Sequence, residues 1–243
     1  MDNLKTNFGK RKVSTKLKTK LVQNVFTNVA SNYDLMNDIM SFGSHRLWKK
    51  ELINIMNIQK NQSIIDVGSG TGDLVNLILE QKKNNDIYAI DPNSKMLEYA
   101  KKRYKNKKVN FFKESAEKLP FKNNSFDKYI ISFCLRNVTD IQSTLKESYR
   151  ILKPGGIFYC LEFSSPENNV INALYNQYKK NVIPWIGSKV TNNKGAYKYL
   201  EESIDQFPNQ KKLISFLNKI GFINSNYLNI FNGIVSIHTA YKI

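Results

Sequence analysis

Short apolar runs alternate with longer amphipathic stretches through the middle of this chain. The runs predict strands at residues 63–67, 86–90, 109–112, 126–132 and 157–163. Helical spacing between them predicts helices at about 72–82, 94–104 and 140–152. Strands that alternate with helices predict a parallel sheet that is covered by helices on both faces.

The flanking segments follow other patterns. Residues 20–56 have helical spacing with a second helix from about 45, and 164–200 contain no convincing strand. A helix is predicted at 209–220, ended by Gly221, with two strands near 222–230 and 234–241. We therefore expect one α/β domain over 20–243, divided into a helical cap (20–60), a ligand-binding core (61–163), a helical insertion on the substrate side (164–208) and a C-terminal helix with strands (209–243).

The net charge of +17 would suit a nucleic-acid-binding protein. However, the chain is rich in Lys, Asn and Ile together, a pattern that AT-rich coding produces without selection for binding. Compositional drift is therefore the favoured explanation, and attraction to an anionic membrane or an acidic partner stays open. Much of the charge lies in residues 1–19, which predict a flexible basic arm.

The remaining bulk properties place the chain among globular proteins of a reducing compartment. No apolar run approaches the roughly 20 residues that a membrane-spanning helix needs. The two cysteines, Cys134 and Cys160, are too few for a disulfide framework and have no metal-ligand spacing. These features predict a cytoplasmic protein without a metal site.

Candidate chemistry begins where the first predicted strand ends, in DVGSGTGD at 66–73. Glycines there, including Gly68 and Gly70, allow a tight turn and close approach of the backbone to a ligand. Asp91 ends the second strand, where a carboxylate is placed to accept hydrogen bonds from both ribose hydroxyls of a nucleoside. Polar groups in ESAE at 114–117, after the third strand, could contact an adenine edge. Together these positions predict a nucleoside site at the carboxyl edge of the sheet.

The order and spacing of these motifs over about 61–163 resemble the class I S-adenosylmethionine (AdoMet)-dependent methyltransferases. The resemblance implies a Rossmann-like seven-stranded sheet whose last strand inserts antiparallel, and AdoMet as the cofactor. The two C-terminal strands agree with that topology.

Longer signatures narrow the match. The segments YDLMNDIMSFGSHRLW (33–48) and RILKPGGIFYCLEFS (150–164), with YKYLEESI (197–204) and Pro208, closely resemble the ubiquinone/menaquinone biosynthesis C-methyltransferases. Cys134 departs from this family, which usually has glycine there, and its Cβ is expected to narrow the site or shift the backbone of Arg136. The resemblance implies AdoMet contacts at Thr71, Asp91, Ser115, Ala116 and Ser132.

The implied reaction places a methyl group on a ring carbon of a polyprenylated benzoquinol, a demethylmenaquinol, or both. The ring carbon attacks well only when an adjacent hydroxyl loses its proton, and free phenols titrate near pH 10. Our hypothesis is that Arg136, just after the fourth strand, favours the quinol anion, and that Asn137 orients Arg136 or the ring. Tyr33 and His45 could close the site and relay a proton. The alternatives are a solvated loop position for Arg136, a turn or N-cap role for Asn137, packing at the cap for Tyr33, and a helix-start or core role for His45.

Several assignments stay open at this stage. Tyr175, Tyr178, Ile183 and Trp185 could line a tunnel for the prenyl tail or form the core of the cap. Glu162 could face the site or serve the fold, whereas His238 alternates with apolar residues and is predicted to be structural. A lipid tail would make peripheral contact with the inner membrane surface useful, and a homodimer or a quinone-biosynthesis complex is also compatible.

The competing functions are methylation of another small molecule or of RNA, and a non-catalytic AdoMet-binding subunit. SFCLRN at 132–137 lacks the Asn-Pro-Pro-Tyr type motif of amino-methylating enzymes, which makes a nucleic-acid partner unlikely. The intact Gly-rich turn, together with Asp91 and Arg136, argues against a loss of catalysis.

Overall fold

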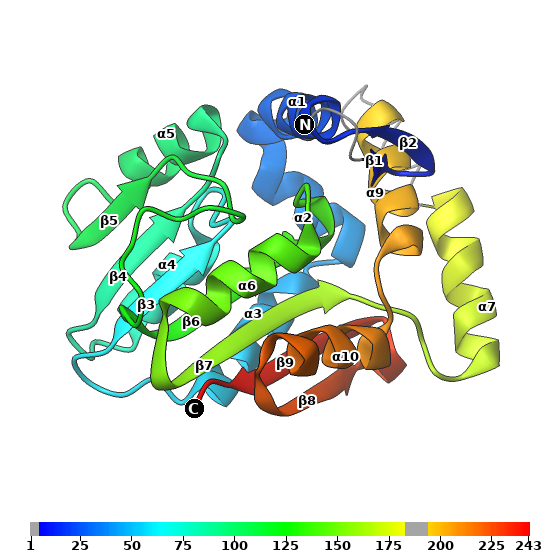
Figure 1. Cartoon of the computed structure of the whole chain (residues 1–243). Coiled ribbons are helices and arrows are strands. Elements are labelled where there is room, and N and C mark those ends of the chain that lie inside the picture. Colours follow the sequence, from blue (N-terminus) through cyan, green and yellow to red (C-terminus); the bar gives the residue numbers. More distant parts are fainter. Residues whose placement is uncertain (1–4, 183–193) are drawn as a thin grey trace.

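The computed structural model describes residues 5–182 and 194–243, and a seven-stranded sheet forms their centre (Figure 1). The strands are β3 (Ser63–Val67), β4 (Asp86–Ile90), β5 (Val109–Phe112), β6 (Phe126–Ser132), β7 (Leu152–Phe163), β8 (Ile223–Ile230) and β9 (Val235–Tyr241). Their order is β5-β4-β3-β6-β7-β9-β8. The first five are parallel, and β9 runs antiparallel between β7 and β8. The expected Rossmann-like topology is confirmed.

Alternation within the strands supplies a separate core on each face of the sheet. In β3, Ile65 and Val67 belong to one apolar cluster and Ile64 belongs to the other. In β6, Tyr129 belongs to the first cluster and the next residue, Ile130, belongs to the second. Successive side chains point to opposite faces, so strands covered on both sides read as continuous apolar runs. This is why the runs could be recognised without any periodic pattern.

Helices cover both faces. The first cluster includes side chains from α6 (Ile141–Ile151) and α10 (Gln210–Ile220), and the second includes side chains from α3 (Ser44–Met56) and α4 (Asp73–Glu80). A further helix, α5 (Ser94–Arg103), follows β4. Asn93 caps α5 by accepting hydrogen bonds from the amides of Lys95 and Met96, and Asp140 caps α6. Gly221 adopts a left-handed conformation and ends α10, as its position predicts.

The N-terminal region differs from the sequence prediction. Residues 5–14 form an antiparallel hairpin of β1 (Lys5–Phe8) and β2 (Arg11–Ser14), and α1 (Thr15–Val29) begins at once. The Phe8 ring stacks on Tyr199 of α9 (Lys194–Gln206) with 4.3 Å between centroids, and the hairpin lies beside α9 in Figure 1. The prediction of a flexible arm is therefore wrong for residues 5–19. Its anchor lies almost 200 residues away in sequence, and local charge gives no sign of it.

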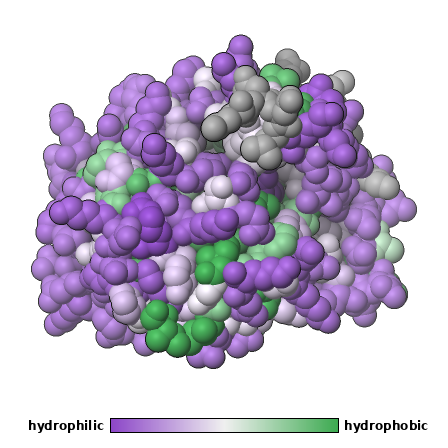
Figure 2. All heavy atoms as spheres, in the orientation of Figure 1, coloured by the Kyte–Doolittle hydropathy of each residue, from purple (hydrophilic) through white to green (hydrophobic). Residues whose placement is uncertain are grey.

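The cap is divided into more and shorter helices than the helical spacing predicts. A short η1 turn (Ala30–Asn32) follows α1, and α2 (Tyr33–Ser41) ends before Phe42 and Gly43, which both have positive φ (49° and 74°). The insertion contains α7 (Asn169–Gln177), a π-helical turn η3 (Tyr178–Val182) and α9. Across the described part of the chain, no helix is both long and apolar enough to cross a membrane. Hydrophilic residues cover most of the face drawn in Figure 2.

Candidate active site

A cavity of about 430 Å³ lies at the carboxyl edge of the sheet, against α1. It is lined from four successive strand ends, by Gly68, Gly70, Asp91, Ser115, Ala116, Cys134 and Asn137. Because parallel strands bring these loops to one edge, residues far apart in sequence meet there. Five of the seven predicted cofactor residues therefore line one cavity; Thr71 and Ser132 do not line it.

The backbone of the Gly-rich turn requires glycine at Gly68. Its φ is +73°, and a Cβ built there would lie 2.2 Å from Sγ of Cys134. Cys134 therefore packs directly over the turn and lines the same cavity. The expectation that its Cβ narrows the site or shifts the backbone of Arg136 is compatible with this placement and stays a prediction.

Asp91 is fixed by two backbone hydrogen bonds. One carboxylate oxygen accepts from the Gly70 amide at 2.9 Å, and the other accepts from the Asn93 amide at 2.8 Å. Burial raises the pKa of Asp91 to about 6. A carboxylate has about four lone-pair positions, so two remain for other donors. The cradle of Gly68, Gly70 and Asp91 thus fits a nucleoside sugar.

A second, smaller cavity of about 80 Å³ lies between the cap and the sheet. It shares Phe26, Tyr33, Gly68, Phe133 and Asn137 with the larger cavity, so the two adjoin. Both remaining predicted cofactor residues line it: Ser132, whose Oγ has no hydrogen-bond partner among the described residues, and Thr71, whose hydroxyl donates to Asp34 at 2.9 Å.

Arg136 lines the smaller cavity as half of a buried ion pair. Its Nη1 donates to Oε1 of Glu162 at 2.6 Å and to the carbonyl of Phe133 at 2.7 Å. The side chain of Arg136 is 7% exposed and that of Glu162 is 0% exposed. The guanidinium also lies over the Phe163 ring, 5.3 Å from its centroid. Arg136 is therefore no solvated loop residue, and Glu162 serves the site by holding it.

Asn137 stands between the two cavities. Its Nδ2 donates to the carbonyl of Phe133 at 3.2 Å, and its Oδ1 accepts from the hydroxyl of Tyr199 at 3.0 Å. The N-cap alternative is excluded, because Asp140 caps the following helix. The turn alternative agrees with the structure, because Asn137 ends the short η2 turn (Leu135–Asn137) and its amide donates to the Cys134 carbonyl at 2.8 Å. Tyr199 also stacks on Phe8, so the N-terminal hairpin supports the site through one intervening side chain.

Tyr33, at the start of α2, lines both cavities. Burial raises the pKa of Tyr33 above the ordinary value for a phenol, although a hydrogen bond with Asn37 opposes this. Tyr33 therefore stays protonated at neutral pH and can donate but not abstract a proton.

Sequence reasoning gave no role to Asp66, which also lines the smaller cavity. It is 1% exposed, its Oδ2 has no partner among the described residues, and burial raises its pKa to about 7. An acid as the fourth residue of a buried strand, just before the Gly-rich turn, was the available signal. Such a carboxylate would be stabilised by a cationic ligand group.

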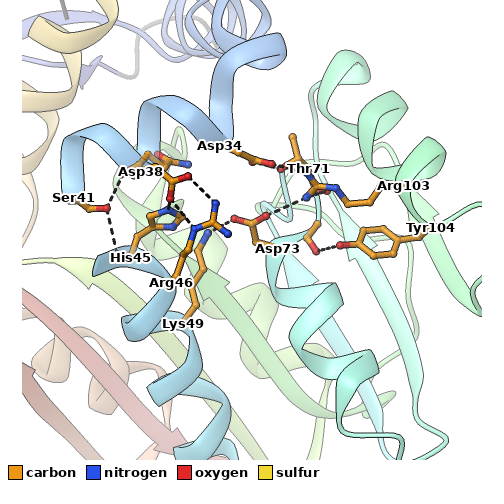
Figure 3. Close-up of polar contacts among 12 residues, drawn as sticks. Asp34, Asp38, Ser41, His45, Arg46, Lys49, Thr71, Asp73, Arg103 and Tyr104 are labelled. Carbon is orange, nitrogen blue, oxygen red and sulfur yellow. Dashed lines mark hydrogen bonds and ion pairs between the residues drawn. The ribbon is translucent and has the colours of Figure 1, made fainter. Parts of the chain in front are cut away.

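Charged side chains join the cap to the core beside this cavity (Figure 3). From the cap, Asp34 pairs with Arg103 of α5, and Lys49 of α3 pairs with Asp73 of α4 at 2.7 Å. Arg103 also reaches Asp73 at 3.2 Å and so connects the two pairs. Positions far apart in the chain are thus held around the cavity rim by ionic contacts.

A third cavity, an apolar groove of about 340 Å³, extends from the site. It shares Ser41, Phe163 and Leu200 with the smaller cavity, and Tyr175 and Tyr178 line it as the tunnel hypothesis requires. Trp185 and Ile183 lie outside the described residues. Among residues 5–182 and 194–243, no cluster of three or more His, Cys, Asp or Glu side chains could hold a metal ion.

Solved structures support this architecture. A SAM-dependent methyltransferase of Thermotoga maritima matches 91% of this chain and 100% of its own, with a TM-score of 0.64 and 20% identity. A Haemonchus contortus phosphoethanolamine N-methyltransferase, solved in complex with S-adenosyl-L-methionine, matches 79% of this chain and 52% of its own, with a TM-score of 0.60 and 15% identity. The chain therefore has the fold of the class I AdoMet-dependent methyltransferases.

Sequence comparison resolves the family. Residues 14–242 match the model of the ubiE/COQ5 methyltransferase family. The ubiquinone/menaquinone biosynthesis C-methyltransferase UbiE of Rickettsia bellii is 48% identical over 98% of this chain and 99% of its own. The mitochondrial 2-methoxy-6-polyprenyl-1,4-benzoquinol methylase of Dictyostelium discoideum is 38% identical over 100% of this chain and 88% of its own. The chain belongs to the ubiE/COQ5 methyltransferase family.

Proposed function

We propose that this methyltransferase places a methyl group on a ring carbon of a polyprenylated benzoquinol, a demethylmenaquinol, or both. Near-full-length similarity to C-methyltransferases of ubiquinone and menaquinone biosynthesis carries the proposal. The cavities support it, because a nucleoside-sized site adjoins a smaller buried site that continues into an apolar groove.

The larger cavity is the proposed AdoMet site. Gly68 and Gly70 present backbone to the ligand, Asp91 accepts from the ribose hydroxyls, and Ser115 with Ala116 contacts the adenine. When bound, AdoMet supplies a methyl group already activated on sulfonium sulfur. Asp66, Thr71 and Ser132 would contact the methionine part at the junction with the smaller cavity, where Asp66 offers an anion to the ammonium group.

In the smaller cavity, Arg136 would hold the quinol oxygen whose proton must leave. Its Nη1 is occupied by Glu162 and Phe133, whereas its buried Nε has no partner among the described residues. That N–H is a donor of fixed geometry for an oxyanion. Asn137 orients Arg136 through their shared contact with the Phe133 carbonyl.

Substrate entry requires the cap to shift. The smaller cavity measures about 80 Å³, whereas an engineered apolar cavity that binds benzene measures about 150 Å³. The ion pair of Asp34 with Arg103 lies between the cap and the core, where the shift would open a path. The prenyl tail would then follow the apolar groove past Phe163 and Tyr175.

The mouth of that groove is the proposed point of contact with a membrane surface. Phe42, Leu174 and Phe231 line the groove and are 76%, 65% and 58% exposed. With a net charge of +17, binding to anionic vesicles should weaken as salt is added. Equal binding to neutral and anionic vesicles would contradict an electrostatic contribution.

The function is tested with labelled AdoMet and three acceptors: a reduced prenylated benzoquinol, a reduced demethylmenaquinol and bulk RNA. We expect label in a quinol product, with mass spectrometry placing the methyl group on ring carbon. Label in RNA alone, or on quinol oxygen, would refute the proposal. Accumulation of a demethylated quinol in a strain that lacks the gene is the corresponding result in cells.

A further inference from the structure

His45 lies in the first turn of α3 and lines the smaller cavity together with Arg136 and Tyr33. It is 4% exposed, and its Nδ1 has no hydrogen-bond partner among the described residues. A buried polar atom without a partner is costly, and each one needs an explanation. Nδ1 of His238 also has no partner among the described residues, but His238 lines none of the three cavities described above, whereas His45 lines the smaller one. The position of His45 on the cavity wall therefore gives its Nδ1 a candidate use.

The other ring nitrogen of His45, Nε2, is hydrogen-bonded to Asp38. Nε2 lies 2.8 Å from Oδ1 of Asp38, and Arg46 binds the same carboxylate through both oxygens at 2.7 Å. Figure 3 shows this Asp38 carboxylate against His45 and Arg46. The hydrogen bonds from Arg46 hold the pKa of Asp38 well below its ordinary value, so the carboxylate is ionised and only accepts. Nε2 must therefore carry the proton, and the neutral ring has its lone pair on Nδ1.

The charged groups around His45 come from three helices. Asp38 of α2 and Asp73 of α4 raise its pKa, whereas Lys49 of α3 lowers it. Burial is the largest influence and sets the direction, so that the pKa of His45 lies below 6.5. The imidazole is therefore neutral at pH 7, while Asp38 is placed to stabilise the imidazolium that forms when a proton arrives.

Other polar residues of the smaller cavity are less suited to accept a proton. Arg136 is a permanent cation, and Tyr33 holds its own proton more firmly than free phenol does. Lys49 is paired with Asp73. Asp66 lies at the end of β3, next to the Gly-rich turn, where the proposed AdoMet ammonium group would occupy it.

We infer that Nδ1 of His45 takes the proton from the quinol hydroxyl next to the accepting carbon; this inference rests on the proposed function. The O–H electron pair moves into the ring as a carbon–methyl bond forms, and the pair of the broken carbon–sulfur bond stays on sulfur. The methylated carbon then loses its proton as the ring regains aromaticity, and the ring oxygen takes one up. One proton per methyl group remains on His45 and is released to water.

His45→Gln tests the inference because a glutamine amide can keep the hydrogen bond to Asp38 but cannot accept a proton. A general base contributes about 10²–10⁴-fold to a rate. We therefore expect kcat for quinol methylation to fall at least about 100-fold, with the KM for quinol and the Kd for AdoMet within about threefold of wild type. His238→Gln is the matched control: His238, the other histidine of the chain, is buried in β9, and its Nε2 lies 3.3 Å from the carbonyl oxygen of Gln210. This variant should keep wild-type kcat.

The pH profile separates a chemical role from a structural one. Wild-type kcat should fall on the acid side as His45 becomes protonated, and this limb should be absent in His45→Gln. In His45→Ala, added imidazole should restore part of the activity. Asp38→Asn should lower kcat and move the acid limb to lower pH, because the anion that raises the pKa of His45 is gone.

A measurement on the ligand-free protein is independent of turnover. With two histidines in the chain, ring nitrogen NMR of wild type and His238→Gln assigns both rings directly. We expect His45 as the neutral Nε2–H tautomer, titrating below 6.5. An Nδ1–H tautomer, or a His45→Gln variant that keeps more than a tenth of wild-type kcat, would overturn the inference while quinol methylation by wild type stands. If wild type methylates no quinol, the proposed function fails, and this step fails with it.

Discussion

Removal of the Arg136 charge should destabilise the fold through the partner that it leaves behind. In Arg136→Met, Glu162 would stay fully buried without a cation, and breaking a buried pair in this way costs about 3–5 kcal/mol. A direct estimate agrees. Glu162 can avoid the unpaired charge by taking up a proton, and from its ordinary pKa of 4.5 this costs about 3 kcal/mol at pH 7, at about 1.4 kcal/mol per pH unit.

The same reasoning fixes the pH dependence. Burial already raises the pKa of Glu162 above its ordinary value in the wild-type fold, although Arg136 opposes this, and loss of Arg136 raises it further. In the variant, the folded protein therefore binds more protons than the unfolded chain between the folded-state and unfolded-state pKa values of Glu162. Stability then falls as pH rises through that window. Urea unfolding should therefore give a deficit of about 3 kcal/mol at pH 7 that shrinks to about 1 kcal/mol at pH 5.

The double variant Arg136→Met/Glu162→Gln separates stability from catalysis. With both charges gone, most of the lost stability should return, because no unpaired charge remains buried. Quinol methylation should not return, because the donor to the quinol oxygen is still absent. A deficit of the single variant that does not change with pH, or a double variant no more stable than the single one, would refute this account of the pair.

Three further predictions concern the cofactor cavity and the hairpin. Asp91→Asn should weaken AdoMet binding about 10- to 100-fold by calorimetry, because two charge-assisted hydrogen bonds to ribose become weaker. It should also lower the free energy of unfolding, because the amide nitrogen replaces one of the two oxygens that accept from the Gly70 and Asn93 amides. An unchanged Kd would contradict the ribose role. Gly68→Ala should abolish AdoMet binding, since its Cβ would meet Cys134 at 2.2 Å. Adding Cys134→Gly should recover only part of the binding, because the φ of +73° remains strained, and full recovery would show that the clash alone matters. Phe8→Ala should lower the free energy of unfolding by about 3 kcal/mol and reduce kcat through Tyr199, and wild-type values for both would show that the hairpin is dispensable.

The sheet and the cavity at its carboxyl edge could be predicted from the sequence because their determinants are local. Each strand is a short apolar run, and the candidate ligand-binding residues follow directly after the runs. Because ligands of parallel sheets bind at the carboxyl ends of the strands, Gly68, Asp91 and Ser115 could be placed at one edge. The resemblance to the family added Thr71 and Ser132, which the structure places around the adjoining smaller cavity.

Features that depend on distant partners could not be obtained in this way. Nothing near Arg136 in sequence indicates that Glu162 holds it, since the pair forms only when β6 and β7 lie side by side. The hairpin was missed for the same reason, because its lysines suggest a solvated arm while Phe8 is anchored on α9. The role of His45 was ambiguous until the structure showed one ring nitrogen bonded to Asp38 and the other without a partner among the described residues.

Several charged side chains at the site are paired with an opposite charge of the protein. Arg136 is paired with Glu162, Lys49 with Asp73, and Asp38 with Arg46. Transfer of a methyl group from a sulfonium cation to a quinol anion turns two opposite charges into neutral products. A bare Arg136 would stabilise the anion strongly but would also repel the sulfonium, whereas the pair with Glu162 leaves a directed N–H donor with little net field. In a buried cavity, where water screens charge poorly, loss of charge along the reaction is favoured, so Glu162 should matter to the rate as well as to the fold.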